Sequence, residues 1–194
     1  MKKHMMRLIV LLAVVACAGC YSRPTVTAGL SPQLKEYYSI YPSVEVDIAA
    51  VTTDEADEIR AQSVENYFAV GNPVRKGLAP HTLSFSSEQT EPRTMKRNAA
   101  EWDVWREKKP EKLAVVANLP RKTEKTLSQK DSRILILDLK TAFLWPDSLY
   151  FEVKPGSVVQ IYSKPQDPEY EIKKLRAERE ELERKKQNQR KNRK

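Results

Sequence analysis

The chain has 194 residues and a formal net charge of +8, and it contains five glycines, two cysteines and two histidines. No Gly-x-Gly-x-x-Gly or phosphate-loop pattern occurs, which argues against a nucleotide-binding fold. A structural zinc site needs about four cysteine, histidine or carboxylate ligands at short spacing, and the sequence supplies no such set. We therefore expect neither a metal nor a cofactor.

The first 20 residues have the organisation of a secretory signal. A basic start containing Lys2, Lys3 and Arg7 is followed by a short apolar run and then by Ala18-Gly19-Cys20. An apolar run of about 11 residues is too short to span a bilayer, which needs about 20. Ala18-Gly19-Cys20 resembles the lipobox of bacterial lipoprotein precursors. The resemblance implies that residues 1–19 are a signal peptide and that Cys20 is the lipid attachment site, acylated after cleavage.

Two alternatives to lipidation stay open. Cys17 stands where a lipobox usually has Leu, and Cys17-Ala18-Gly19-Cys20 is formally a Cys-x-x-Cys motif. A redox motif of that kind is expected to open a helix after a strand, whereas this one ends an apolar signal core. The other alternative is cleavage and secretion without a lipid. Because the context favours a lipoprotein, we expect a lipid-anchored protein of the bacterial cell envelope.

The sequence after Cys20 bears on which membrane holds the anchor. Tyr21 is not an acidic residue. By analogy with proteobacterial lipoproteins, in which an acidic residue there favours retention in the inner membrane, this implies the outer membrane, facing the periplasm.

The excess positive charge is concentrated at one end of the sequence. Of 34 Lys and Arg residues, three precede position 20 and seven lie within 184–194, which contains no acid. The 24 that remain are balanced by 26 Asp and Glu. A nucleic-acid binder typically has a basic stripe on a folded face, with aromatic platforms. We therefore expect a near-neutral body, a cationic tail and no nucleic-acid partner.

Changes in composition divide the rest of the chain into three parts. Residues 20–42, interrupted by three prolines and a glycine, are predicted to be a flexible tether. The tyrosines Tyr37, Tyr38 and Tyr41 near its end either dock on the body or stay partly exposed. Residues 43–163 are the predicted β-rich globular domain. Residues 164–194 are the predicted charged tail, helical or disordered and basic at its end.

Hydrophobic patterning predicts the elements of the body. Residues 44–51 and 81–86 alternate as half-buried strands do, and 113–119 form a continuous apolar run, typical of a central strand buried on both faces. Further strands are predicted at 133–139, 149–153 and 158–162, the last two as a hairpin. A helix is predicted at 54–67, turns at 71–80 and a loop at 88–98. Residues 102–105 form either a strand or a helical turn. We predict a mainly β fold: a single β-sandwich-like domain with one or two short helices, plus a C-terminal charged helix.

The tail from Glu169 onward lacks Gly and Pro and is rich in good helix formers. Ile172, Leu175 and Leu182 lie at heptad spacing, but Arg179 interrupts the seam, so no coiled coil is predicted. We expect a solvated helix whose cationic end binds anionic lipid, binds anionic cell-wall polymers or a partner's acidic face, or only keeps the protein soluble. The final Arg193-Lys194 also resembles the end of the major murein lipoprotein, whose terminal lysine is joined to peptidoglycan.

The residues that could carry catalysis are few. His81 is the one histidine outside the signal, and we interpret it as a strand residue without a catalytic role. The acids within residues 54–58 are better explained as the first turn of a helix, where they complement the helix dipole. Trp102, Trp105 and Trp145 form either a ligand platform or, more commonly for aromatic residues in a sandwich, part of the core. We therefore predict that the protein is not an enzyme.

The body resembles the outer-membrane lipoprotein of the type VI secretion system. The shared features are the lipobox, a first strand at 44–51, the segment around Tyr67-Phe68 and a hydrophobic strand at 113–119. The resemblance implies a compact β-sandwich that docks on an inner-membrane subunit, although the long basic tail is not part of that family's plan. We therefore expect a non-enzymatic scaffold or assembly component with an envelope protein partner. The alternatives are a peptidoglycan- or surface-tethering structural lipoprotein and a ligand-binding lipoprotein.

Overall fold

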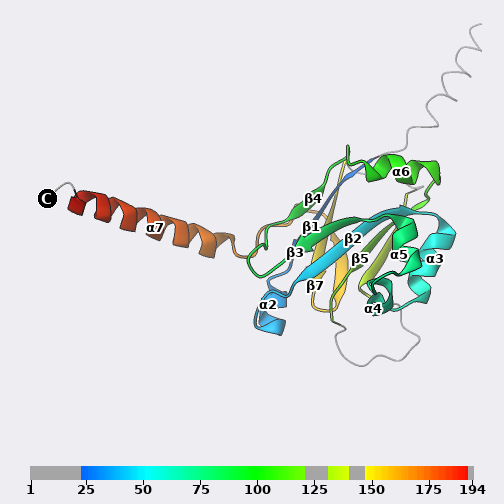
Figure 1. Ribbon diagram of the computed structural model, residues 1–194, viewed down its shortest axis with the longest axis horizontal. Coiled ribbons are helices and arrows are strands. Elements are labelled where there is room, and N and C mark those ends of the chain that lie inside the picture. Colours follow the sequence, from blue (N-terminus) through cyan, green and yellow to red (C-terminus); the bar gives the residue numbers. More distant parts are fainter. Residues whose placement is uncertain (1–22, 121–130, 140–146, 192–194) are drawn as a thin grey trace, which may run out of the picture.

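Two four-stranded β-sheets pack against each other at the centre of the molecule (Figure 1). The computed structural model describes residues 23–120, 131–139 and 147–191. Sheet A has the strand order β4-β1-β7-β8 and sheet B the order β3-β2-β5-β6. The strands are β1 (Thr25–Leu30), β2 (Val44–Val51), β3 (His81–Phe85), β4 (Arg93–Met95), β5 (Lys112–Ala117), β6 (Ile134–Asp138), β7 (Ser148–Lys154) and β8 (Ser157–Ile161).

Sheet B follows the hydrophobic pattern of its sequence closely. Strand β2 has the predicted bounds, and β5, between β2 and β6, is buried on both faces along Leu113–Ala117, as its continuous apolar run predicts. All pairings in sheet B are antiparallel. The alternation of β2 sends Val46 and Ile48 to one face and Asp47 to the other. This places one buried carboxylate, Asp47, on the face of the sheet opposite to Val46 and Ile48.

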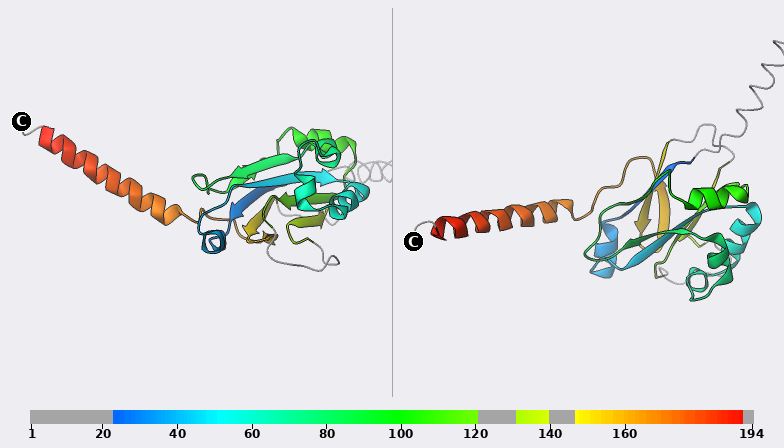
Figure 2. Two further views of the ribbon diagram at one scale, coloured as in Figure 1. Left: turned by 60° about the horizontal axis from the view of Figure 1, so that its bottom comes forward. Right: turned by 45° about the horizontal axis from the view of Figure 1, so that its top comes forward.

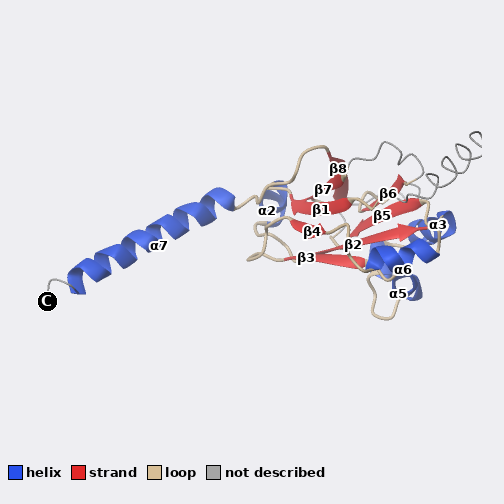
Figure 3. Ribbon diagram, turned by 90° about the horizontal axis from the view of Figure 1, so that it is seen from above, coloured by secondary structure: helices blue, strands red, loops and turns tan. Residues whose placement is uncertain are grey.

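Short helices pack against sheet B. They are α3 (Thr53–Ala61), α4 (Val64–Tyr67), α5 (Pro73–Leu78) and α6 (Glu101–Glu107). Their starts are local in origin: Thr52 and Glu55 form a capping box, Ser63 caps α4, and Asn72 caps α5 with Pro73 in its first turn. Figure 3 shows α3, α5 and α6 gathered at one end of sheet B, away from α7, and Figure 1 shows α4 beside α3 and α5.

Sheet A corrects the prediction of a flexible tether. Residues Thr25–Leu30 form β1, which pairs with β4 antiparallel and with β7 parallel, and α2 (Gln33–Tyr38) follows directly. The prolines at 24 and 32 flank the strand rather than interrupt it, so they mark its ends. The parallel partner β7 lies more than a hundred residues away in sequence, and no local pattern announces it.

Three smaller expectations were also wrong. The predicted loop 88–98 contains β4, the predicted turns at 71–80 contain α5, and the helix predicted over 54–67 is split into α3 and α4 at Gln62-Ser63. Residues 102–105 lie in a helix, α6, which decides between the two alternatives for that segment. The part of the chain that the structure describes has five short helices instead of one or two. The predicted mainly β, sandwich-like class with a C-terminal helix is confirmed.

The last helix, α7 (Tyr170–Lys191), extends away from the sandwich (Figure 1; Figure 2 shows the same in two further views). Its side chains from position 174 to 185 are all exposed. Across the described ranges, no helix combines the length and the apolar character that crossing a bilayer requires.

Candidate functional site

A buried carboxylate holds the helix layer on sheet B. Asp47 Oδ2 accepts a hydrogen bond from Arg75 Nε at 2.7 Å, and Asp47 Oδ1 accepts one from the Thr82 hydroxyl at 2.6 Å. The guanidinium of Arg75 lies 4.6 Å from the ring centre of Phe68. Burial, and then the nearby charge of Asp47, raises the pKa of the Tyr67 phenol well above its usual value. This cluster, which we call the Asp47 cluster, joins β2, β3, α4 and α5.

A second buried charge, Arg133, ties β6 to α4. Its guanidinium donates to Glu65 Oε1 at 2.6 Å, to Asp131 Oδ2 at 2.7 Å, and to the Leu119 carbonyl oxygen. Burial opposes its charge, but the hydrogen bonds to Asp131 and Glu65 raise the pKa of Arg133. The same hydrogen bond lowers the pKa of Glu65. Because its hydrogen bonds go to Glu65, Asp131 and Leu119 of the same body, Arg133 acts as a structural clasp.

The turn between β1 and β2 presents apolar side chains to solvent. Tyr37 is 48% exposed and Ile40 63% exposed. The turn itself is fixed from below, because Leu34 and Tyr41 are buried in the core and the Tyr38 hydroxyl donates to the Pro120 carbonyl oxygen at 3.4 Å. We call Tyr37 and Ile40 with their supporting turn the α2 ridge. A fixed apolar ridge of this kind is suited to docking a protein surface, since little conformational entropy is lost when it is covered.

Helix α7 begins beside the α2 ridge. Lys35 of α2 pairs with Glu169, the residue before α7, at 2.6 Å. Lys173 Nζ lies 2.6 Å from Glu91 Oε1 and 3.0 Å from Asp167 Oδ2, and it donates to the Thr90 hydroxyl at 3.1 Å. Thr90 in turn donates to Asp167 Oδ1 at 2.7 Å. We call Thr90, Glu91, Asp167 and Lys173 the α7 root.

The pKa values of three side chains in the α7 root, Asp167, Glu91 and Lys173, differ from their usual values. Partial burial opposes the charge of Asp167, but hydrogen bonds from the Glu169 backbone N–H, Thr90 and Lys173 lower its pKa. The hydrogen bond from Lys173 also lowers the pKa of Glu91. Desolvation disfavours the ammonium, yet the hydrogen bonds to Glu91 and Asp167 raise the pKa of Lys173. The ionised forms of all three side chains are therefore stabilised by one another.

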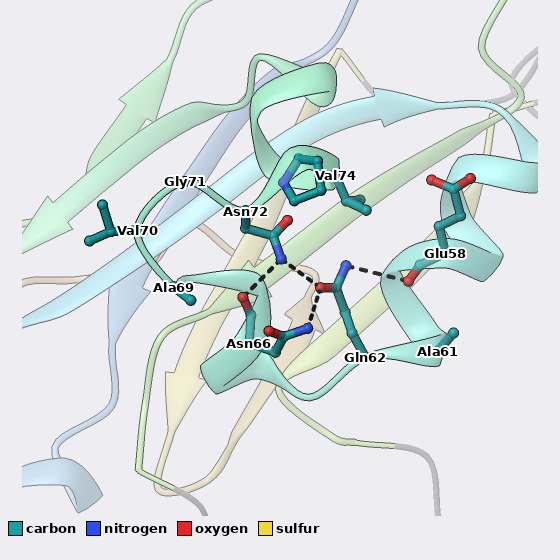
Figure 4. A pocket seen from close by; sticks show the side chains of 10 residues that line it. Glu58, Ala61, Gln62, Asn66, Ala69, Val70, Gly71, Asn72 and Val74 are labelled. Atoms are coloured by element: carbon teal, nitrogen blue, oxygen red, sulfur yellow. Dashed lines mark hydrogen bonds between the residues drawn. The ribbon is translucent and has the colours of Figure 1, made fainter.

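A shallow, open pocket lies between α3, α4 and α5 (Figure 4). Its volume is about 530 Å³, and Val70 at its rim is fully exposed. The polar side chains at its floor are bound to one another: Asn72 Nδ2 donates to Gln62 Oε1 at 2.8 Å, and Asn66 Nδ2 donates to the same oxygen at 3.2 Å. These hydrogen bonds link the three helices, so the floor is explained by the packing of the fold.

The residues considered for catalysis are not brought together. His81 Nδ1 lies 2.9 Å from Glu101 Oε1, but the neighbouring Thr82 points to the opposite face of β3, where it binds Asp47. A histidine and a hydroxyl on opposite faces of one strand do not form a nucleophile–base pair. The acids of residues 54–58 lie in the first two turns of α3, as the helix interpretation predicts. In the described ranges, no group of three or more His, Cys, Asp or Glu side chains is placed to hold a metal ion.

Two of the three tryptophans belong to the core. Trp102 and Trp105 are fully buried, with ring centres 5.1 Å apart in an edge-on arrangement, and Trp105 Nε1 donates to the Leu78 carbonyl oxygen at 3.0 Å. The core interpretation of these two is confirmed, and no ligand can stack on them without unpacking α6. Trp145 and the predicted lipid attachment site Cys20 lie outside the described residues.

The tyrosines near position 40 divide between the two alternatives. Tyr41 docks on the body and Tyr37 is half exposed. The exposure of Ile40 was not predicted, although an aliphatic residue between Ser39 and Tyr41, outside any alternating run, is a signal for an exposed apolar position. Asp47 was not predicted either, and its signal is an acid directly before the apolar residues 48–51 of the same strand.

Comparisons with known proteins give likenesses of structure alone. No protein-family model and no curated protein matches the sequence. Among solved structures, the C-terminal domain of the type VI secretion protein TssM from EAEC is similar, with a TM-score of 0.46 and 14% identity over 71% of this chain and 99% of that one. Lip of Serratia marcescens, described as a membrane-bound component of the type VI secretion system, has a TM-score of 0.45 and 10% identity over 72% of this chain and 96% of that one. The type VI lipoprotein TssJ1 of Pseudomonas aeruginosa has a TM-score of 0.45 and 14% identity over 74% of this chain and 98% of that one. Identities and scores this low assign no role to any residue.

Proposed function

We propose that this chain is a lipid-anchored protein of the bacterial cell envelope that acts as a non-enzymatic scaffold or assembly component. The anchor is Cys20, and the outer membrane, facing the periplasm, is its location. The signal-like first 19 residues and the small residues before Cys20 support the anchor. Stable anchoring takes two or more acyl chains, which lipidation of this type supplies.

The α2 ridge is the observation that carries the scaffold role. Tyr37 and Ile40 are exposed on a turn that is held by the buried side chains of Leu34 and Tyr41, and this support favours a ridge that keeps its shape without a partner. The sequence resemblance to the type VI outer-membrane lipoprotein suggests an inner-membrane subunit of a secretion system as the class of partner. A ligand-binding role is not favoured, because Trp102 and Trp105 are core residues and the pocket of Figure 4 is shallow and open.

The anchor and the ridge are tested separately. A Cys20→Ala form is expected to leave the membrane fraction, and its firm retention there would contradict the anchor. For the ridge, a photo-cross-linking residue is placed at Tyr37 in intact cells. A discrete protein adduct is expected, and the substitution Ile40→Asp is expected to abolish it.

The matched control for the ridge is Val104, which is 51% exposed on α6, close to the 48% of Tyr37. A cross-linker at position 104 is expected to give no such adduct, and Val104→Asp is expected to leave the adduct from position 37 intact. Equal adducts from both positions, or none from position 37, would overturn the scaffold role of the ridge.

A further inference from the structure

Helix α7 exposes a line of aliphatic side chains along one of its faces. Ile172, Leu175 and Leu182 are all exposed, and the helix contains no other Ile, Leu or Val. At about 100° per residue, the three side chains lie within an arc of about 80° around the helix axis. A helix that is only solvated gains nothing from such an alignment, whereas aligned apolar side chains are typical of a contact surface. We call Ile172, Leu175 and Leu182 the α7 seam.

The α7 seam lies on a side of the helix that the body does not use. Lys173 is held by three oxygen atoms of the α7 root, and the seam residues lie about 100–180° around the helix axis from it. The segment before the helix is fixed as well, because Pro165 packs on Gly29 so closely that a Cβ atom at position 29 would lie 2.5 Å from Pro165 Cβ. A second helix can therefore lie on the seam without disturbing the contacts that hold α7.

Arg179 interrupts the seam in sequence, but its charge is directed to the side of the seam. Arg179 Nε lies 3.5 Å from Glu183 Oε1, one turn further along the helix. The apolar stem of an arginine can cover an aliphatic side chain while its guanidinium stays in water. The apolar contact can therefore continue from Leu175 to Leu182 across this position.

The spacing of the seam matches an antiparallel copy of itself. Residues 172 and 182 are equally far from Ala177. Two antiparallel copies of α7 with a two-fold axis near Ala177 therefore place Ile172 of each copy opposite Leu182 of the other. In the same arrangement Leu175 of each copy faces the stem of Arg179 of the other. Reciprocal contacts of this kind define a two-fold dimer interface.

The charges beside the seam favour the antiparallel direction. Arg176 and Glu183 lie on one flank of the seam, and Glu178 lies on the other. In an antiparallel pair the same flanks meet, so Arg176 of each copy lies near Glu183 of the other. In a parallel pair opposite flanks meet, and Glu178 of each copy would repel Glu183 of the other. The antiparallel pair has one like-charge contact, between the two Glu178 side chains near the axis, against two attractive contacts.

A membrane surface fits the seam less well than a second copy does. Helices that lie on anionic membranes have Lys and Arg on their polar face. Leu182, the seam residue farthest from the body, has Glu181 and Glu183 as its neighbours in sequence. An anionic surface would repel both carboxylates.

We propose that the α7 seam is a self-association surface through which two copies of this chain form an antiparallel helix pair. The inference goes beyond the proposed function, because it depends neither on the lipid anchor nor on the α2 ridge. Residues 172–182 cover about 16 Å of helix. A contact of this length belongs with the small interfaces, below about 1,200 Å², that hold weak and reversible complexes.

The first test is disulfide cross-linking of residues 20–194 with Cys20→Ala, a chain that contains no other cysteine. An Ile172→Cys form and an affinity-tagged Leu182→Cys form are mixed at about 0.5 mM, a concentration suited to a weak complex. Because Ile172 faces Leu182 of the other copy, the mixed disulfide is expected at least about fivefold above either disulfide between identical variants. A predominance of Leu182→Cys pairs would mean a parallel dimer, and equal yields would mean random collision. Either result overturns the proposal.

The second test measures the dissociation constant of the dimer by sedimentation equilibrium. Arg176→Glu is expected to weaken the dimer at least about fivefold, since it replaces two attractions with two repulsions. Adding Glu183→Arg to Arg176→Glu exchanges the charges and is expected to restore affinity to within about twofold of the parent. The matched control is Arg184→Glu, because Arg184 is exposed on the face opposite the seam. Its affinity is expected to stay within about twofold of the parent.

The remaining outcomes contradict the proposal. Equal weakening by Arg176→Glu and Arg184→Glu would mean that net charge alone is responsible. A protein that stays monomeric at about 0.5 mM has no self-association surface of this kind, and one that is monomeric but binds phospholipid vesicles through the seam would assign the seam to lipid. Because both tests use a chain without an anchor and leave the α2 ridge unchanged, their failure is distinguishable from failure of the proposed function.

Discussion

The Asp47 cluster and the α7 root contain the same three kinds of group at different depths. Each has an aspartate that accepts from a threonine hydroxyl and from a cation, Arg75 in one and Lys173 in the other. The Asp47 side chain is 1% exposed and is gripped by two guanidinium nitrogens, whereas that of Asp167 is 10% exposed and meets a single ammonium. The bidentate, buried pair joins a helix layer to a sheet, and the shallower one orients a helix whose side chains from position 174 to 185 are all exposed.

The largest expected effect is that of removing the deeper carboxylate. Asp47→Ala leaves Arg75 and Thr82 without their acceptor, and we expect a loss of about 3 kcal/mol in the free energy of unfolding. Urea unfolding followed by tryptophan fluorescence measures it. Asp57→Ala is the control, because that carboxylate is 67% exposed in its pair with Arg60 and should cost less than about 0.5 kcal/mol. Similar losses of unfolding free energy from both substitutions would show that the burial of the carboxylate does not determine its contribution to stability.

A smaller effect on stability is expected from the corresponding change at the root. Asp167→Ala should cost about 1 kcal/mol, because Lys173 keeps Glu91 and can reach water. Its main consequence is a wider range of α7 directions, measured as a broader distance distribution between spin labels at Val70 and Leu182, both exposed. Glu178→Ala, on the free part of the helix, should leave the distribution narrow. An unchanged distribution in Asp167→Ala would contradict the role of the root.

The smallest expected effect is a pH dependence of the contacts in the α7 root. The pKa values of Asp167 and Glu91 are lowered in the folded protein, so their stabilisation is present above the unfolded pKa, near 4, and is lost as the pH falls through the lower folded values. The spin-label distance distribution is therefore expected to broaden reversibly below about pH 4 while the sandwich stays folded. Broadening that coincides with loss of the tryptophan signal at every pH would mean that the root has no transition of its own.

Sequence patterns predicted those parts of the fold whose partners are close or whose burial is uniform. The alternation of residues 44–51 and the continuous run in β5 report burial directly, and the hairpin β7–β8 has its turn in sequence. Strand β1 was not predicted, because Thr25–Leu30 contains small residues between two prolines and its sheet partners are remote in sequence. Helix α5 had a local signal, Asn72 as cap and Pro73 in its first turn, which was interpreted as a turn.

The candidate sites were less accessible to sequence reasoning than the fold. The charges of α7 can be counted from the sequence, but the direction in which the helix leaves the body depends on the α7 root and on the packing of Pro165 against Gly29. The α2 ridge depends on which of three neighbouring tyrosines is buried, and tertiary packing decides that. Charges and their order are thus predictable, whereas the faces and directions on which they act are set by contacts between remote segments.

The position of β1 between β4 and β7 has a mechanical consequence. A pull on Arg23 along the axis of β1 would load the hydrogen bonds to β4 and β7 in shear, because this strand is bonded on both edges to neighbours that lie along the force. Under such shear the hydrogen bonds of both ladders must give way together, whereas a strand peeled from a sheet edge loses them one at a time. Strand β1 would therefore resist such a pull better than the edge strands β4 and β8.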